Sequence, residues 1–162
     1  MLSRDSEMNV ENRSNLVSFS FYTTYAFLLT TATITFIEAM RNPDAKIRHI
    51  LNLETCISIV AAFFYSQFVE KLKSEETPDY KSLNITRYTD WAITTPIMLL
   101  VLILAMRYNS KTGSLPFSNF VIVLVLNYLM LGFGYFGELE LISRENALFF
   151  GFVAFSIFFF WI

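Results

Sequence analysis

Long apolar segments separated by short charged connections are the feature that most constrains how this chain folds. Of its 26 charged residues (12 basic and 14 acidic), four lie inside these segments, namely Glu38, Glu54, Arg87 and Asp90. Each segment has about the 20 residues that an α-helix needs to cross a bilayer, whereas the alternation typical of membrane strands is absent. We therefore predict an all-α, polytopic membrane helix bundle in a single transmembrane domain over residues 1–162, with helices at about residues 17–40, 50–69, 86–106, 116–137 and 146–162.

Basic residues in the short connections predict how this bundle lies in the membrane. The connection after the first segment has three basic residues and one acid, and the connection after the third has Arg107 and Lys111. The remaining connections and residues 1–16 are net acidic. Because positive loops stay on the cytoplasmic side, we predict an extracellular N-terminus. The protein is expected to be an integral, multi-pass protein of the plasma membrane of a cell or host.

Arg87 and Asp90 lie three residues apart inside the third apolar segment. A charged side chain at the centre of a bilayer costs at least about 2.5 kcal/mol, so the charges that remain there pair or face a polar interior. Together with Thr94 they share one side of a helix. They are therefore candidates for a working site. The structural alternative is a buried ion pair that only holds helices together.

A second stripe on the same helix, with a matching stripe in the fourth segment, indicates a ligand site. Trp91, Thr95 and Met98 offer a flat ring, a hydroxyl and a thioether on one side of the helix. This mixture suits a long apolar ligand lying beside the charged pair. Small and polar residues at helical spacing in the fourth segment allow close approach by a ligand or helix; they are Asn127, Met130 and Gly134.

The second segment carries a polar stripe made of Glu54, Ser58 and Tyr65. Glu54 is near the predicted inner end of its helix and Asp90 near the outer end of the next, about 15 Å apart along the membrane normal. Two acids at opposite depths favour successive stations on an ion route over a catalytic pair. The alternative for Glu54 is a protonated acid, or one that reaches the nearby membrane surface.

Three further features have structural interpretations. Pro96 frees a backbone carbonyl within the third helix, and we expect neighbouring threonine hydroxyls to satisfy it. Glu38, one turn from the first basic connection, is expected to pair with Arg41. The Phe-rich fifth segment is predicted to be a packing helix.

The motif R-Y-x-D-W-x-x-T-T-P-x-x-L-L, which begins at Arg87, resembles the third helix of microbial rhodopsins, the seven-helix retinal proteins. The fourth segment, L-N-x-x-M-x-G-x-G-x-x-G, is similar to the fourth helix of that family, and Tyr65 matches a tyrosine of its second helix. The resemblance covers the second to fourth segments well, and the first and fifth by order and length.

The resemblance implies a role for each matching residue. Asp90 is the expected counter-ion and proton acceptor of a protonated retinal Schiff base, and Arg87 and Thr94 belong to the same region. Asn127 and Thr95 are expected to form an interhelical hydrogen bond that influences gating in family channels. The implied retinal pocket is Trp91, Thr95, Met98, Asn127, Met130 and Gly134, and the implied ion pathway is Glu54, Ser58 and Tyr65. The implied cofactor is all-trans retinal.

Two departures from the family pattern bear on function. Val101 stands where outward proton pumps carry a carboxylate donor, whereas Glu54 resembles helix-B glutamates of channelrhodopsins and of rhodopsins encoded by large algal viruses. The family also binds retinal through a lysine of the seventh helix. This chain has no lysine within an apolar segment and no sixth or seventh segment. We therefore expect a truncated protein, with the sixth and seventh helices of the family (helices F and G) as partners missing from this sequence.

Three functions follow from these features. The first is a light-gated cation channel, favoured by Glu54 and Val101. The second is a light-driven proton pump or photosensor, favoured by Asp90 and Thr94, and the third is a truncated, retinal-free membrane scaffold. Membrane lipid, retinal and further copies of the chain are the expected partners. With one cysteine and one histidine, the sequence predicts no metal site, and we expect neither nucleic-acid binding nor enzymatic activity.

Overall fold

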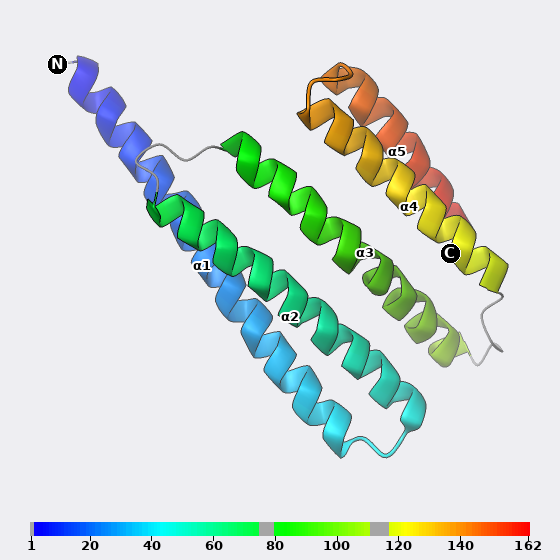
Figure 1. Cartoon of the computed structure of the whole chain (residues 1–162). Helices are drawn as coiled ribbons and strands as arrows, with labels where there is room; N and C mark the ends of the chain where they lie inside the picture. The colour runs from blue at the N-terminus through cyan, green and yellow to red at the C-terminus, as the bar shows by residue number, and fades with distance from the viewer. Residues whose placement is uncertain (1, 75–79, 111–116) are drawn as a thin grey trace.

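The described backbone is helical apart from short connections between helices. The computed structural model describes residues 2–74, 80–110 and 117–162, and the side chains of residues 15–72, 81–110 and 117–162. Five α-helices follow one another in the order α1 (Leu2–Arg41), α2 (Ala45–Ser74), α3 (Tyr80–Ser110), α4 (Phe117–Glu138) and α5 (Arg144–Trp161). The predicted all-α architecture is confirmed. Figure 1 shows the helices side by side, with α3 in the middle.

The observed helices extend beyond three of the predicted segments. α1, α2 and α3 have 40, 30 and 31 residues, because the polar residues that flank an apolar run continue the same helix. Within the described residues, four helices are long and apolar enough to cross a membrane, namely α2 to α5. α1 is not among these four, in contrast to the predicted five. Its apolar half carries six threonines between residues 23 and 35, which lower its hydropathy.

The threonine hydroxyls of α1 form hydrogen bonds within the helix itself. The hydroxyls of Thr23, Thr24, Thr30 and Thr33 each donate to the carbonyl four residues earlier, at 2.8 to 2.9 Å. Thr35 does the same and also contacts Thr55 of α2, with 2.8 Å between the two hydroxyl oxygens. Because its hydroxyls have partners, such a helix tolerates an apolar environment.

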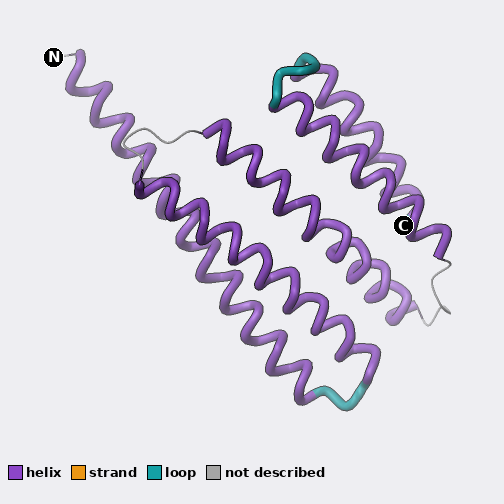
Figure 2. The backbone as a smooth tube through the Cα atoms, in the orientation of Figure 1, coloured by secondary structure: helices purple, strands orange, loops and turns teal. Residues whose placement is uncertain are grey.

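The helices form an open row and not a closed ring. Among the described residues, helix packing joins only neighbours in the sequence: α1 with α2, α2 with α3, α3 with α4, and α4 with α5. In their described parts α1 and α5 are not in contact, and Figure 2 shows the same arrangement along the backbone. The middle helix α3 is therefore the element that joins the two halves of the molecule.

Two apolar clusters hold α3 at its opposite ends. Near its first turns, Leu83 packs with Phe68 and Leu72 of α2, and the partly buried Phe21 of α1 covers them. Near its last turns, apolar side chains of α3, α4 and α5 pack together; they are Leu99, Ile103, Val123 and Phe158. The core is thus divided between the ends of α3, and the middle of this helix is left to polar residues.

Polar contacts fix the two tight connections. Before α2, the Asp44 carboxylate accepts from the Lys46 backbone amide at 2.8 Å and from the Tyr108 hydroxyl of α3 at 3.0 Å. Before α5, Ser143 caps the helix by accepting from the Asn146 amide at 3.3 Å. The predicted pair of Glu38 and Arg41 is present at 3.7 Å.

Candidate functional site

Asp90 is a buried acid in the middle helix with an unused hydrogen-bonding atom. Its exposure is 3%, and its Oδ1 atom has no hydrogen-bond partner among the described residues. The Thr94 hydroxyl donates to the backbone carbonyl of Asp90 at 2.9 Å, one turn away. A buried carboxylate oxygen without a partner is costly, and a proton on the carboxyl group or a cationic or donor group from elsewhere would remove this cost.

Arg87 does not supply that group directly. Both residues are described, and no ion pair within 4.0 Å joins them; the Arg87 guanidinium instead lies 5.0 Å from the centroid of the Trp91 ring. A cation over an aromatic face is an attractive contact that competes with ion pairing. The buried ion pair considered from the sequence is therefore not formed, although the two residues share a stretch of helix.

The hydrogen bond predicted between the third and fourth helices is present. Asn127 of α4, 1% exposed, donates from Nδ2 to the Thr95 hydroxyl oxygen at 2.9 Å. Thr95 in turn donates to the Trp91 carbonyl at 2.6 Å. The amide of α4 is thereby connected to the turn of α3 that carries Trp91. An influence of this bond on gating stays a prediction.

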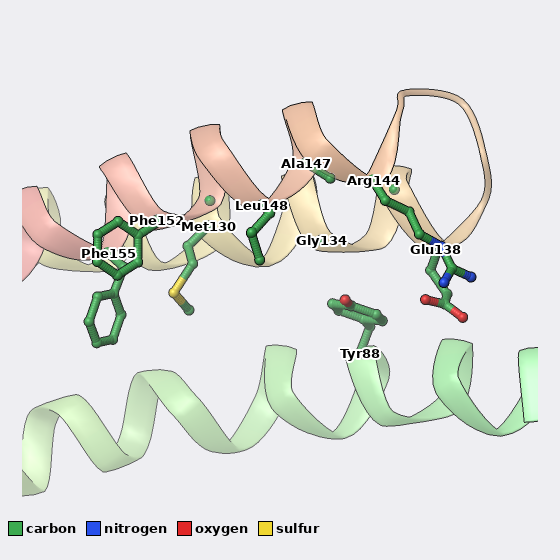
Figure 3. A pocket seen from close by; sticks show the side chains of 11 residues that line it. Tyr88, Met130, Gly134, Glu138, Arg144, Ala147, Leu148, Phe152 and Phe155 are labelled. Carbon is green, nitrogen blue, oxygen red and sulfur yellow. The ribbon is translucent and has the colours of Figure 1, made fainter.

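An apolar cavity of about 540 Å³ lies where α3, α4 and α5 meet. Two predicted retinal residues, Met130 and Gly134, line it, and Glu138 and Arg144 lie at one end (Figure 3). Tyr88 of α3 lines it from the opposite side, as Figure 3 also shows. The other lining residues come from the end of α4 and from α5: Gly137, Ala147, Leu148, Gly151, Phe152 and Phe155.

The fifth helix is more than the packing element that the sequence predicted. Leu148, Gly151, Phe152 and Phe155 place one side of α5 along the cavity. Their spacing of three, one and three residues is that of a single helical face, and this was the signal available in the sequence. This face was missed because the segment contains many phenylalanines, and a face with several aromatic residues resembles ordinary helix packing.

Gly134 is required by the close approach of Tyr88. A Cβ atom at position 134 would lie 2.7 Å from the Tyr88 hydroxyl oxygen and 2.9 Å from the nearest ring carbon. Since real Cβ contacts are longer than this, any side chain at 134 would displace the ring. The glycine therefore lets the α3 tyrosine reach the α4 backbone beside the cavity.

Other predicted pocket residues lie outside this cavity. Met98 is 52% exposed and does not line it. Trp91 does not line it either, but the Trp91 and Tyr88 rings meet edge to face with centroids 5.4 Å apart. The structure thus brings Met130 and Gly134 together with Tyr88, connects Trp91 to them through a ring contact, and leaves Met98 on the surface of α3.

Consecutive residues of α3 line two different cavities. Tyr88 lines the one described above, and Arg87 lines a second cavity of about 410 Å³ between α1, α2 and α3. Tyr65, predicted on the ion pathway, also lines this second cavity, together with Ser20 and Thr24. Its apolar walls are Leu16, Val17 and Phe21. The helix that carries Asp90 therefore has a cavity on each side near its first turns.

The remaining pathway residues lie in α2, away from both cavities. Ser58 is buried and Glu54 is half-buried, and neither lines a described cavity. Thr55, next to Glu54, forms the hydroxyl contact with Thr35 of α1. The sequence predicted the stripe of polar residues on α2 but not this contact between the first two helices.

The carbonyl freed by Pro96 is satisfied in a way that the sequence prediction missed. The threonine hydroxyls at 94 and 95 donate to the carbonyls of Asp90 and Trp91, so the expectation that they serve the freed carbonyl was wrong. The carbonyl four residues before Pro96 belongs to Ala92, and it accepts from the Tyr128 hydroxyl of α4 at 3.1 Å. A partner on another helix has no signature in the local sequence.

Comparison with known proteins agrees with this architecture. A family model described as bacteriorhodopsin-like protein matches residues 15–162. The crystal structure of the viral rhodopsin OLPVRII is 54% identical, with a TM-score of 0.85 over 90% of this chain and 69% of that one. A blue light-absorbing proteorhodopsin from Med12 shares the fold at 21% identity, with a TM-score of 0.75 over 90% of this chain and 66% of the other. Among curated protein sequences nothing matches. The chain belongs to the bacteriorhodopsin-like family of multi-pass membrane proteins, and it is similar to viral members of that family.

Proposed function

We propose that this chain is the retinal-binding part of a light-gated cation channel, with Asp90 as counter-ion and proton acceptor. The observation that carries the proposal is the buried Oδ1 atom of Asp90, which has no partner among the described residues. A cationic nitrogen of a bound chromophore is the partner that a retinal protein would bring to this atom. Family membership supports a retinal photoreceptor of the membrane.

The residues around the larger cavity fit retinal. Its volume of about 540 Å³ is within the range of about 300 to 1,000 Å³ typical of ligand pockets. Met130, Phe152 and Phe155 offer apolar contacts, and the Tyr88 ring, which Gly134 allows to approach α4, lines the cavity from α3. Bound to a lysine as a protonated Schiff base, retinal would supply light absorption and a positive charge on the Schiff-base nitrogen. We expect Trp91 to lie against it from α3.

The protein residues would then hold and move a proton. A charged carboxylate at position 90 is desolvated, so it is stable only beside a positive charge. Oδ1 of Asp90 would accept a proton from the positively charged group beside it, and both buried charges would then be removed together. Arg87, close by but stacked on Trp91, remains on the side of the second cavity, where it can respond to the change of charge at Asp90.

Residues toward the predicted cytoplasmic side of the membrane favour a passive channel over a pump. Val101 is apolar where an outward pump needs a proton donor, whereas α2 carries the polar residues Glu54 and Ser58, which we expect to lie on an ion route. A light-driven proton pump or photosensor is the second candidate, and the buried acceptor Asp90 supports it. A retinal-free scaffold is the outcome if no chromophore binds.

Photocurrents separate these functions. The chain would be continued with the remaining part of the viral rhodopsin relative, expressed in cells and supplied with all-trans retinal. A channel gives currents that reverse sign with voltage, and Glu54→Gln reduces them while the exposed-site control Thr89→Val does not. Currents of a single sign at every voltage would indicate a pump and contradict the channel proposal.

A further inference from the structure

Pro96 leaves α3 with a backbone defect in the middle of a membrane-spanning helix. Proline has no backbone N–H, so the carbonyl four residues earlier, that of Ala92, loses its intrahelical partner. In a bilayer no water replaces the lost bond, and a neighbouring helix has to satisfy such a carbonyl. The freed carbonyl, that of Ala92, directly follows Asp90 and Trp91, the residues at the centre of the candidate site.

Two consecutive residues of α4 contact the turn before Pro96, and one of them, Tyr128, satisfies the freed carbonyl. The Tyr128 hydroxyl donates to the Ala92 carbonyl at 3.1 Å, and Asn127 donates to the Thr95 hydroxyl oxygen at 2.9 Å. Through Thr95 the second bond continues to the Trp91 carbonyl at 2.6 Å. α4 is therefore attached to α3 at two points within the turn that precedes Pro96.

We propose that Tyr128 is a positioning residue of the site: its hydroxyl replaces the N–H that Pro96 lacks, and together with Asn127 it holds the proline turn of α3 against α4. Tyr128 is 47% exposed, so burial of its ring does not explain its place. Its hydroxyl has a specific acceptor, the Ala92 carbonyl, which lacks an intrahelical donor because residue 96 is proline. The assignment concerns how α3 is held and needs no retinal, so its failure would leave the proposed function standing.

The position of the hydrogen bond from Tyr128 to the Ala92 carbonyl explains why this bond matters for Asp90. A proline turn without its missing bond is a flexible point at which the first half of α3 can tilt. That half carries Asp90, Trp91 and Tyr88, and the Tyr88 ring approaches α4 so closely that Gly134 is needed. A small tilt would change this contact and the distance of Asp90 from the cavity. The bond from Tyr128 removes that freedom.

A double-mutant cycle between Tyr128 and Pro96 tests the assignment with the full chain in lipid. Tyr128→Phe is expected to raise the unfolding equilibrium constant about 3- to 10-fold, the range typical of interhelical hydrogen bonds in membranes and of an unsatisfied carbonyl. Pro96→Ala restores the N–H at residue 96, so in that background the effect of Tyr128→Phe should fall below about 2-fold. A packing role would give the same effect in both backgrounds.

Tyr135→Phe is the matched control on the same helix. In the part of the chain that the structure describes, the Tyr135 hydroxyl has no hydrogen-bond partner, and its ring contacts Tyr88 and Phe136. Its removal should leave the unfolding constant within about 2-fold of the starting value in either background. An equal effect of Tyr128→Phe with and without Pro96, or no effect in the natural background, would overturn the assignment.

The Ala92 carbonyl can also be observed directly. Ala92–Ile93 is the one Ala–Ile pair in the sequence, so labelling alanine with ¹³C at the carbonyl and isoleucine with ¹⁵N selects this carbonyl in solid-state NMR. Loss of its hydrogen bond in Tyr128→Phe should move the ¹³C resonance upfield, and Tyr135→Phe should not move it. A resonance at the same position in the natural chain and in Tyr128→Phe would overturn the assignment even if both variants fold.

Discussion

At the scale of the residue, side-chain contacts separate what periodicity predicts from what it does not. The bond between Asn127 and Thr95 was predicted and is present, because both residues belong to a motif whose helices pack in a known way. Contact between Arg87 and Asp90 was not observed, since helical spacing places two residues on one side of a helix but does not fix their rotamers. The acceptor for Tyr128 was missed for a related reason: it is a backbone atom of another helix.

Gly134→Ala tests the close approach of Tyr88 to α4. The added Cβ would lie 2.7 Å from the tyrosine hydroxyl, so we expect a loss of about 1 to 3 kcal/mol in the free energy of unfolding. Gly132→Ala is the control, because nothing lies within 4 Å of the added atom. It should be neutral or stabilise the helix by up to about 1 kcal/mol. The free energy of unfolding of both variants is measured in denaturant. Equal values for the two variants would contradict the close contact between Tyr88 and Gly134.

Thr95→Val tests the buried bond at the centre of α3 and α4. The variant keeps the shape of the side chain but removes the acceptor of Asn127, whose amide is buried at 1% exposure. We expect a destabilisation of about 1 kcal/mol, measured as the free energy of unfolding. Thr89→Val on the exposed side of the same helix should change it by less than about 0.5 kcal/mol. Equal effects at 89 and 95 would show that the bond contributes nothing.

At the scale of the element, the ends of the helices were the least predictable part of the fold. The apolar runs located all five helices, but α1 to α3 continue into polar residues, which have helical propensity and no local signal to stop. α5 shows a second limit. Its bounds were close to the prediction, yet its role in lining the larger cavity depends on how it packs against α4.

The carboxylate of Asp44, a titratable group, links the start of α2 to the end of α3 through hydrogen bonds. The Lys46 backbone amide and then the Tyr108 hydroxyl stabilise the Asp44 carboxylate, so the pKa of Asp44 is below its ordinary value. A lowered pKa in the folded state means that the contribution to stability is present above the ordinary pKa of about 4 and is lost as pH falls through the lowered value.

Tyr108→Phe tests this connection through its pH dependence. The variant should be less stable than the natural chain at neutral pH, and the difference should shrink below about pH 4 as Asp44 is protonated. The measurement is the free energy of unfolding of both proteins between pH 7 and the acid range. With Asp44→Asn as background the difference should no longer vary with pH. A difference that grows on acidification would contradict the assignment.

At the scale of the whole molecule, α3 is the centre of an open row of helices. It joins α1 and α2 to α4 and α5. Its consecutive residues Arg87 and Tyr88 line different cavities on its two sides. The sequence predicted the class, the order of the helices and the hydrogen bond between Thr95 and Asn127. It did not predict the open row or the two cavities, because these depend on which side chains of neighbouring helices fit together.

The absorption spectrum tests the central claim, that Asp90 is the counter-ion of a retinal site. The chain continued with the remaining part of the viral rhodopsin relative, mixed with all-trans retinal, should develop a visible band. Asp90→Asn should move this band to longer wavelength, because removing a negative charge removes stabilisation of the positive chromophore in its ground state. Glu54→Gln should leave it in place. A fully folded chimera without a visible band, or with the same band in Asp90→Asn, would contradict the account.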